Sequence, residues 1–186
     1  NTIGEVSYMV SANIATNNNE ITDLSSSNDI INNLENGHGV AKYILREGES
    51  IGSFYGFESD GLYTQEEIDA GHYYTYGGVT PNAGDTKFVP QRELDWGEEI
   101  TDSDRTIIGC EVPDFTYGIN LSVNYKNFEF SIFGQGICGA DVAFEVYQVH
   151  PFFHGQDNPR RYHMGRWSEE NPNPHAIYPR IYTASS

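Results

Sequence analysis

The sequence has few basic residues and no long apolar run. Its 186 residues include 10 Lys and Arg against 27 Asp and Glu, which gives a formal net charge of −17. A chain this acidic is repelled by nucleic acid and by anionic lipid head groups, so we expect neither as a partner. No segment approaches the roughly 18 consecutive apolar residues of a transmembrane helix. Strands of a β-barrel give no such signal, so a membrane location stays open.

Cysteine is also scarce, and no catalytic constellation is present. The two cysteines, Cys110 and Cys138, are compatible with one disulfide or with two free thiols, and their spacing fits no zinc motif. No Ser/His/Asp or Cys/His set has catalytic spacing. The acidic residues are too numerous to single out a glycosidase pair. We therefore expect a protein that is not an enzyme.

Long alternation of apolar and polar residues is the main pattern that the sequence does have. In residues 115–125 an aromatic or aliphatic side chain occupies every second position, which is the period of a β-strand. The pattern resumes at 128–133 after Lys126-Asn127, so the two stretches predict an antiparallel hairpin. Residues 5–15 alternate in the same way and predict a third long strand. Soluble strands usually have about 5–6 residues, whereas a strand that crosses a bilayer needs about 9–11.

Two fold classes fit three long strands of this kind. The first is an all-β chain that is part of a large antiparallel transmembrane β-barrel with long extracellular loops. A barrel that spans a membrane needs at least about eight strands, so this chain would supply only some of them. The second is a secreted soluble β-sandwich that binds carbohydrate through exposed aromatic residues. The apolar stripe at 115–125 faces lipid in the barrel and a core in the sandwich.

The remaining residues lack long alternation and read as loop regions. We predict a barrel strand at 1–15, a loop region at 16–112, a barrel hairpin at 113–137 with its turn at 126–127, and a second loop region at 138–186. Outer-membrane barrels have short periplasmic turns and long external loops. The turn is therefore expected in the periplasm and both loop regions outside the cell. Within the first loop region, Thr64-Gln65-Glu66-Glu67 matches a capping box that opens a helix.

A family resemblance is carried by six phrases that occur in order: NNNEITDL (17–24), REGESIGSFYGFESDGLYTQEEID (46–69), GDTKF (84–88), DSDRTIIG (102–109), PDFTYGINLSVNYKNFEFSIFGQG (113–136) and RWSEENPNPHAIYPR (166–180). Together they resemble the C-terminal part of the SusC/RagA family of TonB-dependent outer-membrane transporters of Bacteroidetes. The resemblance implies that the chain is a portion of an importer of oligosaccharides or peptides. It also implies a SusD-like lipoprotein as partner, and the TonB system as energy source through a plug region absent from these residues.

Candidate contact residues are the aromatic side chains of the loop regions: Tyr73, Tyr74, Tyr76, Trp96 and Trp167. Flat rings with polar tips can stack on sugar rings or on a partner protein. The alternative for each of them is packing within the loops.

A candidate cation site follows GDTKF. In the family this stretch often resembles D-x-N-G-D-G-x-I-x-x-x-D, an oxygen-rich loop suited to calcium. In this sequence Leu94-Asp95-Trp96-Gly97 replaces the N-G-D-G core. The acidic residues that remain are Asp95, Glu98, Glu99, Asp102 and Asp104. They predict either a calcium site or a solvated acidic loop.

Overall fold

Strands dominate the computed structural model, which describes residues 2–25, 28–33, 42–144 and 158–182. In chain order the elements are β1 (Thr2–Ile3), β2 (Val6–Thr16), β3 (Ile30–Asn33), β4 (Lys42–Leu45), β5 (Ser53–Gly56), β6 (Ser59–Leu62), α1 (Gln65–Asp69), β7 (Thr75–Tyr76), β8 (Thr86–Phe88), β9 (Glu99–Ile100), the 3-10 helix η1 (Asp102–Asp104), β10 (Thr106–Cys110), β11 (Phe115–Tyr125), β12 (Phe128–Cys138) and the 3-10 helix η3 (Arg161–Gly165). The predicted all-β class is confirmed. Among these residues no helix is long and apolar enough to cross a membrane.

The chain divides into two compact units. The first comprises residues 1–32, 43–54 and 109–142, and the second comprises residues 33–42, 55–108 and 143–186. The long strands belong to the first unit. The aromatic and acidic residues that the sequence singles out belong to the second unit.

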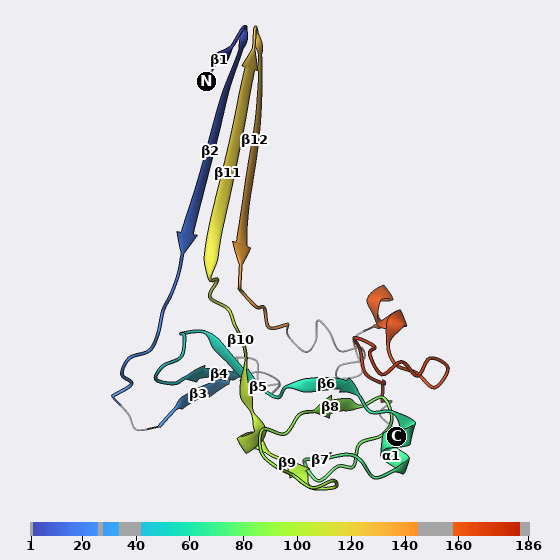
Figure 1. Ribbon diagram of the computed structural model, residues 1–186. Coiled ribbons are helices and arrows are strands. Elements are labelled where there is room, and N and C mark those ends of the chain that lie inside the picture. Colours follow the sequence, from blue (N-terminus) through green and yellow to red (C-terminus); the bar gives the residue numbers. More distant parts are fainter. Residues whose placement is uncertain (1, 26–27, 34–41, 145–157, 183–186) are drawn as a thin grey trace. The chain divides into compact units, whose positions relative to one another are not determined.

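The first unit contains the three long strands that the sequence predicts (Figure 1). β2, β11 and β12 have 11 residues each and lie in a sheet of order β1-β2-β11-β12. β11 is the central strand and pairs antiparallel with both neighbours along its full length. Its first residue, Phe115, is the Cα partner of Thr16 on β2 and of Cys138 on β12. The predicted antiparallel arrangement of three long strands is therefore confirmed.

The register of the sheet separates an apolar face from a polar one. In the middle of the sheet Val10, Leu121 and Ile132 are Cα partners across the three strands, and they share one face. The neighbouring row, which points to the opposite face, contains Ser11, Asn120 and Phe133. Val10 is 61% exposed and Ile132 is 52% exposed. A soluble sandwich would bury this face in its core, so that alternative does not fit the sheet.

Each end of the long sheet is fastened in a different way. Lys126 and Asn127 join β11 to β12, and Lys126 has a left-handed φ of 51°, as tight hairpin turns require. The Lys126 Nζ lies 3.3 Å from a carboxylate oxygen of Glu5. At the other end the Asn17 N–H donates to the Asp114 carbonyl at 2.8 Å, and the Asp114 N–H donates to the Cys138 carbonyl at 3.0 Å. These bonds hold the three strand ends together where the chain enters its loop regions.

Side-chain hydrogen bonds join distant loops of the first unit. The Asn19 Oδ1 accepts from both the Ser50 hydroxyl and the Ile51 N–H, which joins two loops that are distant in sequence. The Tyr43 hydroxyl donates to Glu111 at 2.6 Å, and this hydrogen bond raises the pKa of Tyr43 to about 12. Cys110 and Cys138 are free thiols. A further four-stranded sheet, which is not confined to the first unit, has the order β10-β5-β4-β3.

The second unit has a small core and two short sheets. Leu62, Ala83 and Trp167 form the buried cluster, with Ile68 and Ala176 packed against it. β6 pairs antiparallel with β8, and β7 pairs parallel with β9. The predicted capping box is confirmed at α1, because the Thr64 side chain accepts the Glu67 N–H and the Glu67 carboxylate accepts the Thr64 N–H. Segments far apart in the sequence therefore meet in this unit.

Candidate functional site

Trp96 lies in a partly exposed aromatic cluster of the second unit. Its ring stacks on Tyr74, with centroids 4.9 Å apart and planes at 27°, and on His72, with centroids 5.2 Å apart and planes at 30°. Trp96 is 55% exposed. Such a ring offers a flat apolar surface to a sugar or to an apolar side chain.

The short parallel pairing of β7 with β9 positions this cluster. The Gly97 N–H donates to the Tyr73 carbonyl at 2.8 Å, and the Thr75 N–H donates to the Glu98 carbonyl at 2.9 Å. The Tyr74 N–H also donates to the hydroxyl of Tyr63, which is buried. The backbone on both sides of Trp96 is therefore fixed, so the stack is held in place before any ligand arrives.

Tyr76 belongs to a separate aromatic cluster. Its ring meets Phe57 edge to face at 5.3 Å and Phe88 at 5.8 Å. The guanidinium of Arg105 lies 4.2 Å from the centre of the Phe57 ring. Tyr76 is still 46% exposed, so it packs on one side and meets solvent on the other. No pattern in the sequence indicated a role for Phe57, because that residue stands outside any long alternation.

Trp167 lies in the core of the second unit. It is 7% exposed and packs with Leu62 and Ala83. Gly84 makes this packing feasible, since a Cβ at that position would collide with the Trp167 ring. The guanidinium of Arg180 lies 5.4 Å from the Trp167 ring centre. Trp167 therefore packs within the second unit, which is the alternative to ligand contact given above.

The carboxylates of four of the five acidic residues at 95–104, Glu98, Glu99, Asp102 and Asp104, are held by protein groups. Asp104 is fully buried, with Arg92 Nε 3.2 Å from its Oδ1 and the Thr101 N–H donating to its Oδ2 at 2.9 Å. Burial raises the pKa of Asp104, but the hydrogen bond from Thr101 and the charge of Arg92 outweigh it, so the pKa is lowered overall. Asp102 accepts from Arg105 Nε at 2.8 Å.

The two glutamates of this loop bind backbone N–H groups. A carboxylate oxygen of Glu98 accepts the Asp95 N–H at 3.0 Å, and one of Glu99 accepts the Gly78 N–H at 3.0 Å. Nowhere in the described residues do three His, Cys, Asp or Glu side chains gather as metal ligands would. Thr101 and Asp104 instead form a second capping box, at η1, which the sequence reading missed. Its signal is the T-x-x-D spacing, the same as that at Thr64 with Asp in place of Glu.

Comparison with known proteins identifies relatives of this chain. No protein-family profile matches the chain. The chain is 32% identical over 179 residues to TonB-dependent receptor P3 of Formosa agariphila, an alignment that covers 95% of this chain and 17% of that receptor.

The chain belongs to the TonB-dependent receptor family.

Two further receptors of the same organism agree with this assignment. TonB-dependent receptor P26 is 30% identical over 164 residues, which is 86% of this chain and 16% of the relative. TonB-dependent receptor P39 is 26% identical over 171 residues, which is 73% of this chain and 15% of the relative. The chain thus spans about a sixth of the length of the curated receptors it matches. Its three long strands are part of the β-barrel of a TonB-dependent receptor, and they do not close a barrel themselves.

Proposed function

We propose that the chain is a portion of a SusC/RagA-type importer that carries oligosaccharides or peptides across the outer membrane. The observation that supports this best is the register of β2, β11 and β12, which gathers apolar side chains on one face along 11 residues. At about 3.3 Å per residue such a strand is roughly 36 Å long. A tilt of about 45° leaves roughly 25 Å along the membrane normal, the height of the apolar band of an outer-membrane barrel.

The lengths of the connections between the strands support one orientation of the strands in the membrane. β11 and β12 are joined by two residues, whereas β2 and β11 are separated by a long loop region. We propose that the Lys126-Asn127 turn faces the periplasm, and that the loop regions 16–112 and 138–186 lie outside the cell. The importer would work with a SusD-like lipoprotein outside, and with the TonB system through a plug region that these residues do not include.

Within the loops we assign ligand contact to Trp96 with the rings stacked on it. Tyr74 stacks on Trp96, and Tyr73 is joined to Gly97 through its carbonyl, whereas Tyr76 lies in the separate cluster with Phe57 and Phe88. The exposed indole is the part of the Trp96 cluster that a sugar ring or an apolar peptide side chain can reach. The role of this surface is binding, without bond chemistry. Calcium at residues 95–104 stays a prediction.

Labelling of intact cells tests the orientation. In the full-length receptor with Cys110→Ser and Cys138→Ser, we would introduce Asn127→Cys or Glu93→Cys, since Glu93 is exposed in the second unit. A membrane-impermeant maleimide should label position 93 in intact cells, and position 127 only after the outer membrane is permeabilised. Equal labelling of both positions in intact cells would contradict the orientation.

Uptake measurements test the ligand contact. Cells that carry the full-length receptor would be given a panel of fluorescent oligosaccharides and peptides. An aromatic contact is worth about 0.5–1.5 kcal/mol. Trp96→Ala should therefore raise the probe concentration that gives half-maximal uptake by about 2- to 13-fold. Trp96→Phe, which keeps a flat ring, should lose less. Transport without any dependence on TonB would contradict the proposed function itself.

A further inference from the structure

Basic residues are concentrated in one stretch of the second unit. Residues 158–182 hold four of the ten Lys and Arg of the chain but only two of its 27 acidic residues. This stretch therefore carries a net charge of +2, while the remainder of the chain carries −19. Like charges brought together across an interface are costly, so an acidic partner approaches such a chain favourably only at its basic stretch.

The basic stretch is folded. His163 caps the start of η3, because its Nδ1 accepts the Arg160 N–H at 2.9 Å. The His163 ring is 3% exposed and meets Tyr178 edge to face at 4.8 Å. The Trp167 N–H donates to the Tyr178 carbonyl at 3.0 Å, which ties the end of η3 to the segment that follows. Side chains on this stretch are therefore presented from a fixed backbone.

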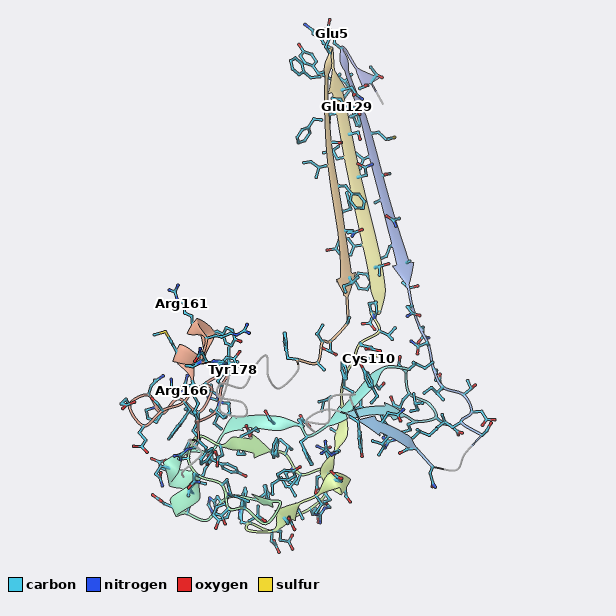
Figure 2. All side chains as sticks on the ribbon, turned by 180° about the vertical axis from the view of Figure 1, so that it is seen from behind. Glu5, Cys110, Glu129, Arg161, Arg166 and Tyr178 are labelled. Carbon is cyan, nitrogen blue, oxygen red and sulfur yellow. The ribbon has the colours of Figure 1, made fainter. Side chains whose placement is uncertain are left out.

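Two arginines of the stretch are available to a partner. Arg161 is exposed and Arg166 is partly exposed, and neither forms an ion pair with another residue that the structure describes. Both lie in the same part of the second unit as Tyr178 (Figure 2). Arg180, in contrast, is used inside the unit, where it donates to the Ala83 carbonyl and lies 5.0 Å from the Tyr182 ring centre.

The same stretch carries large exposed apolar side chains. Met164, in η3, is 77% exposed, and Ile177, next to Tyr178, is 88% exposed. Tyr162 stacks on Tyr178 with centroids 5.5 Å apart and planes at 28°. Arg, Tyr and Met are enriched at protein interfaces, where exposed apolar groups form the centre and charges the rim. Aliphatic Met164 and Ile177 favour a protein partner over a sugar, which would need flat rings.

We propose that the surface formed by Arg161, Tyr162, Met164, Arg166 and Ile177, the arginine surface, binds a protein whose contact face carries carboxylates around an apolar centre. Guanidinium groups bind carboxylates through paired hydrogen bonds, which fixes the orientation of the partner. Met164 and Ile177 leave water on binding. The arginine surface is separate from the ligand contact of the proposed function, because it involves none of the ligand-contact residues and does not depend on what the receptor transports.

Photo-crosslinking tests the arginine surface in the full-length receptor in its own cells. The photoreactive residue p-benzoylphenylalanine would replace Met164, and in a matched strain it would replace Val79, which is 66% exposed in the same unit. Position 164 should give a protein adduct that position 79 does not give. Mass spectrometry should place the adduct in a partner peptide with an excess of Asp and Glu.

Charge reversal distinguishes this surface from a merely exposed one. Arg161→Glu should reduce the adduct about tenfold or more, as expected when a charge-assisted hydrogen bond is lost. Lys126→Glu changes the charge equally at the hairpin turn and should leave the adduct unchanged. Replacing an acidic residue of the crosslinked partner peptide by Arg should restore the adduct with Arg161→Glu.

Several outcomes would overturn the proposal. They are an adduct in a neutral or basic peptide, an adduct insensitive to Arg161→Glu, and the lack of an adduct when heat-modifiable gel migration shows the receptor to be folded. A further outcome is binding of uronate- or sulfate-bearing oligosaccharides by the purified receptor, lost with Arg161→Glu and without any protein adduct. That result would assign the surface to an anionic glycan.

Discussion

Two adjacent residues in the middle of β11 allow a matched test of which face meets lipid. Ile119 belongs to the apolar face and is the Cα partner of Ala12, whereas Asn120 belongs to the polar face and is the Cα partner of Ser11. Ile119→Lys and Asn120→Lys introduce the same side chain at nearly the same depth. They differ in the side of the sheet on which the new charge stands.

The expected free energies of unfolding differ clearly between the two variants. Position 119 is the fifth of the 11 residues of β11, so it lies close to the middle of the strand. A Lys on the lipid face at the bilayer midplane costs about 2–4 kcal/mol, which is about 30- to 900-fold in the folding equilibrium. Asn120→Lys places the ammonium on the hydrated side, where a substitution usually changes stability by less than about 0.5 kcal/mol.

Denaturant titration of the full-length receptor in lipid vesicles would measure the two costs, with heat-modifiable gel migration as the readout of the folded barrel. The linear dependence on denaturant gives the free energy of unfolding for each variant. The reasoning is refuted if both variants lose the same stability, or if Asn120→Lys is the more damaging one. Either result would mean that the apolar face of the sheet does not meet lipid.

Three further predictions concern the second unit. Gly84→Ala, at φ +88° and against Trp167, should cost about 2–4 kcal/mol in the local opening free energy measured by hydrogen exchange at the Trp167 amide. Gly78→Ala, at φ +73° with nothing within 4 Å, should cost only about 1–2 kcal/mol, and equal costs would reject the packing argument. Burial raises the pKa of Glu67, but the hydrogen bond from the Thr64 N–H and the charge of Lys87 lower it by more. The pKa of Glu67 in the folded protein therefore lies below the ordinary 4.5. The stability that Glu67 contributes is therefore present above pH 4.5 and lost as the pH falls through the folded value. Hydrogen exchange at the Ile68 amide should accelerate as the pH falls from 4.5 through the folded pKa of Glu67, and Glu67→Gln should abolish this pH dependence. Because protein groups hold Asp102 and Asp104, removing divalent cations with EDTA should leave exchange of residues 92–105 unchanged, whereas calcium-dependent protection would restore the cation-site alternative.

Local patterns predicted the elements that depend on nearby residues. Period-two alternation holds from Phe115 to Tyr125 because successive side chains of a strand point to opposite faces, and one of these faces is apolar, so the sequence alone indicates that strand. The α1 helix was equally readable, since Thr64 and Glu67 satisfy each other's backbone groups within four residues.

Contacts between distant residues explain what the sequence could not predict. Trp167 is buried because Gly84, 83 positions earlier, leaves room for its ring, and no pattern within either phrase indicates this. Asp104 looked like a potential cation ligand but is enclosed by Arg92 and a capping box. The arginine surface also escaped notice, because its charge stands out only against the acidic remainder of the chain.

The pairing of Thr16 with Phe115 sets an order for assembly of the sheet. The β11–β12 hairpin closes over two residues, whereas pairing β2 with β11 closes a loop of about a hundred residues. The difference in closure entropy is about 3 kcal/mol. The hairpin should therefore form early and β2 should join late, once the intervening loops have folded and the Asn17–Asp114 hydrogen bond holds their ends together. The slow step in completing this sheet is then the folding of the loop regions, so mutations outside the long strands can limit how fast β2 joins the hairpin.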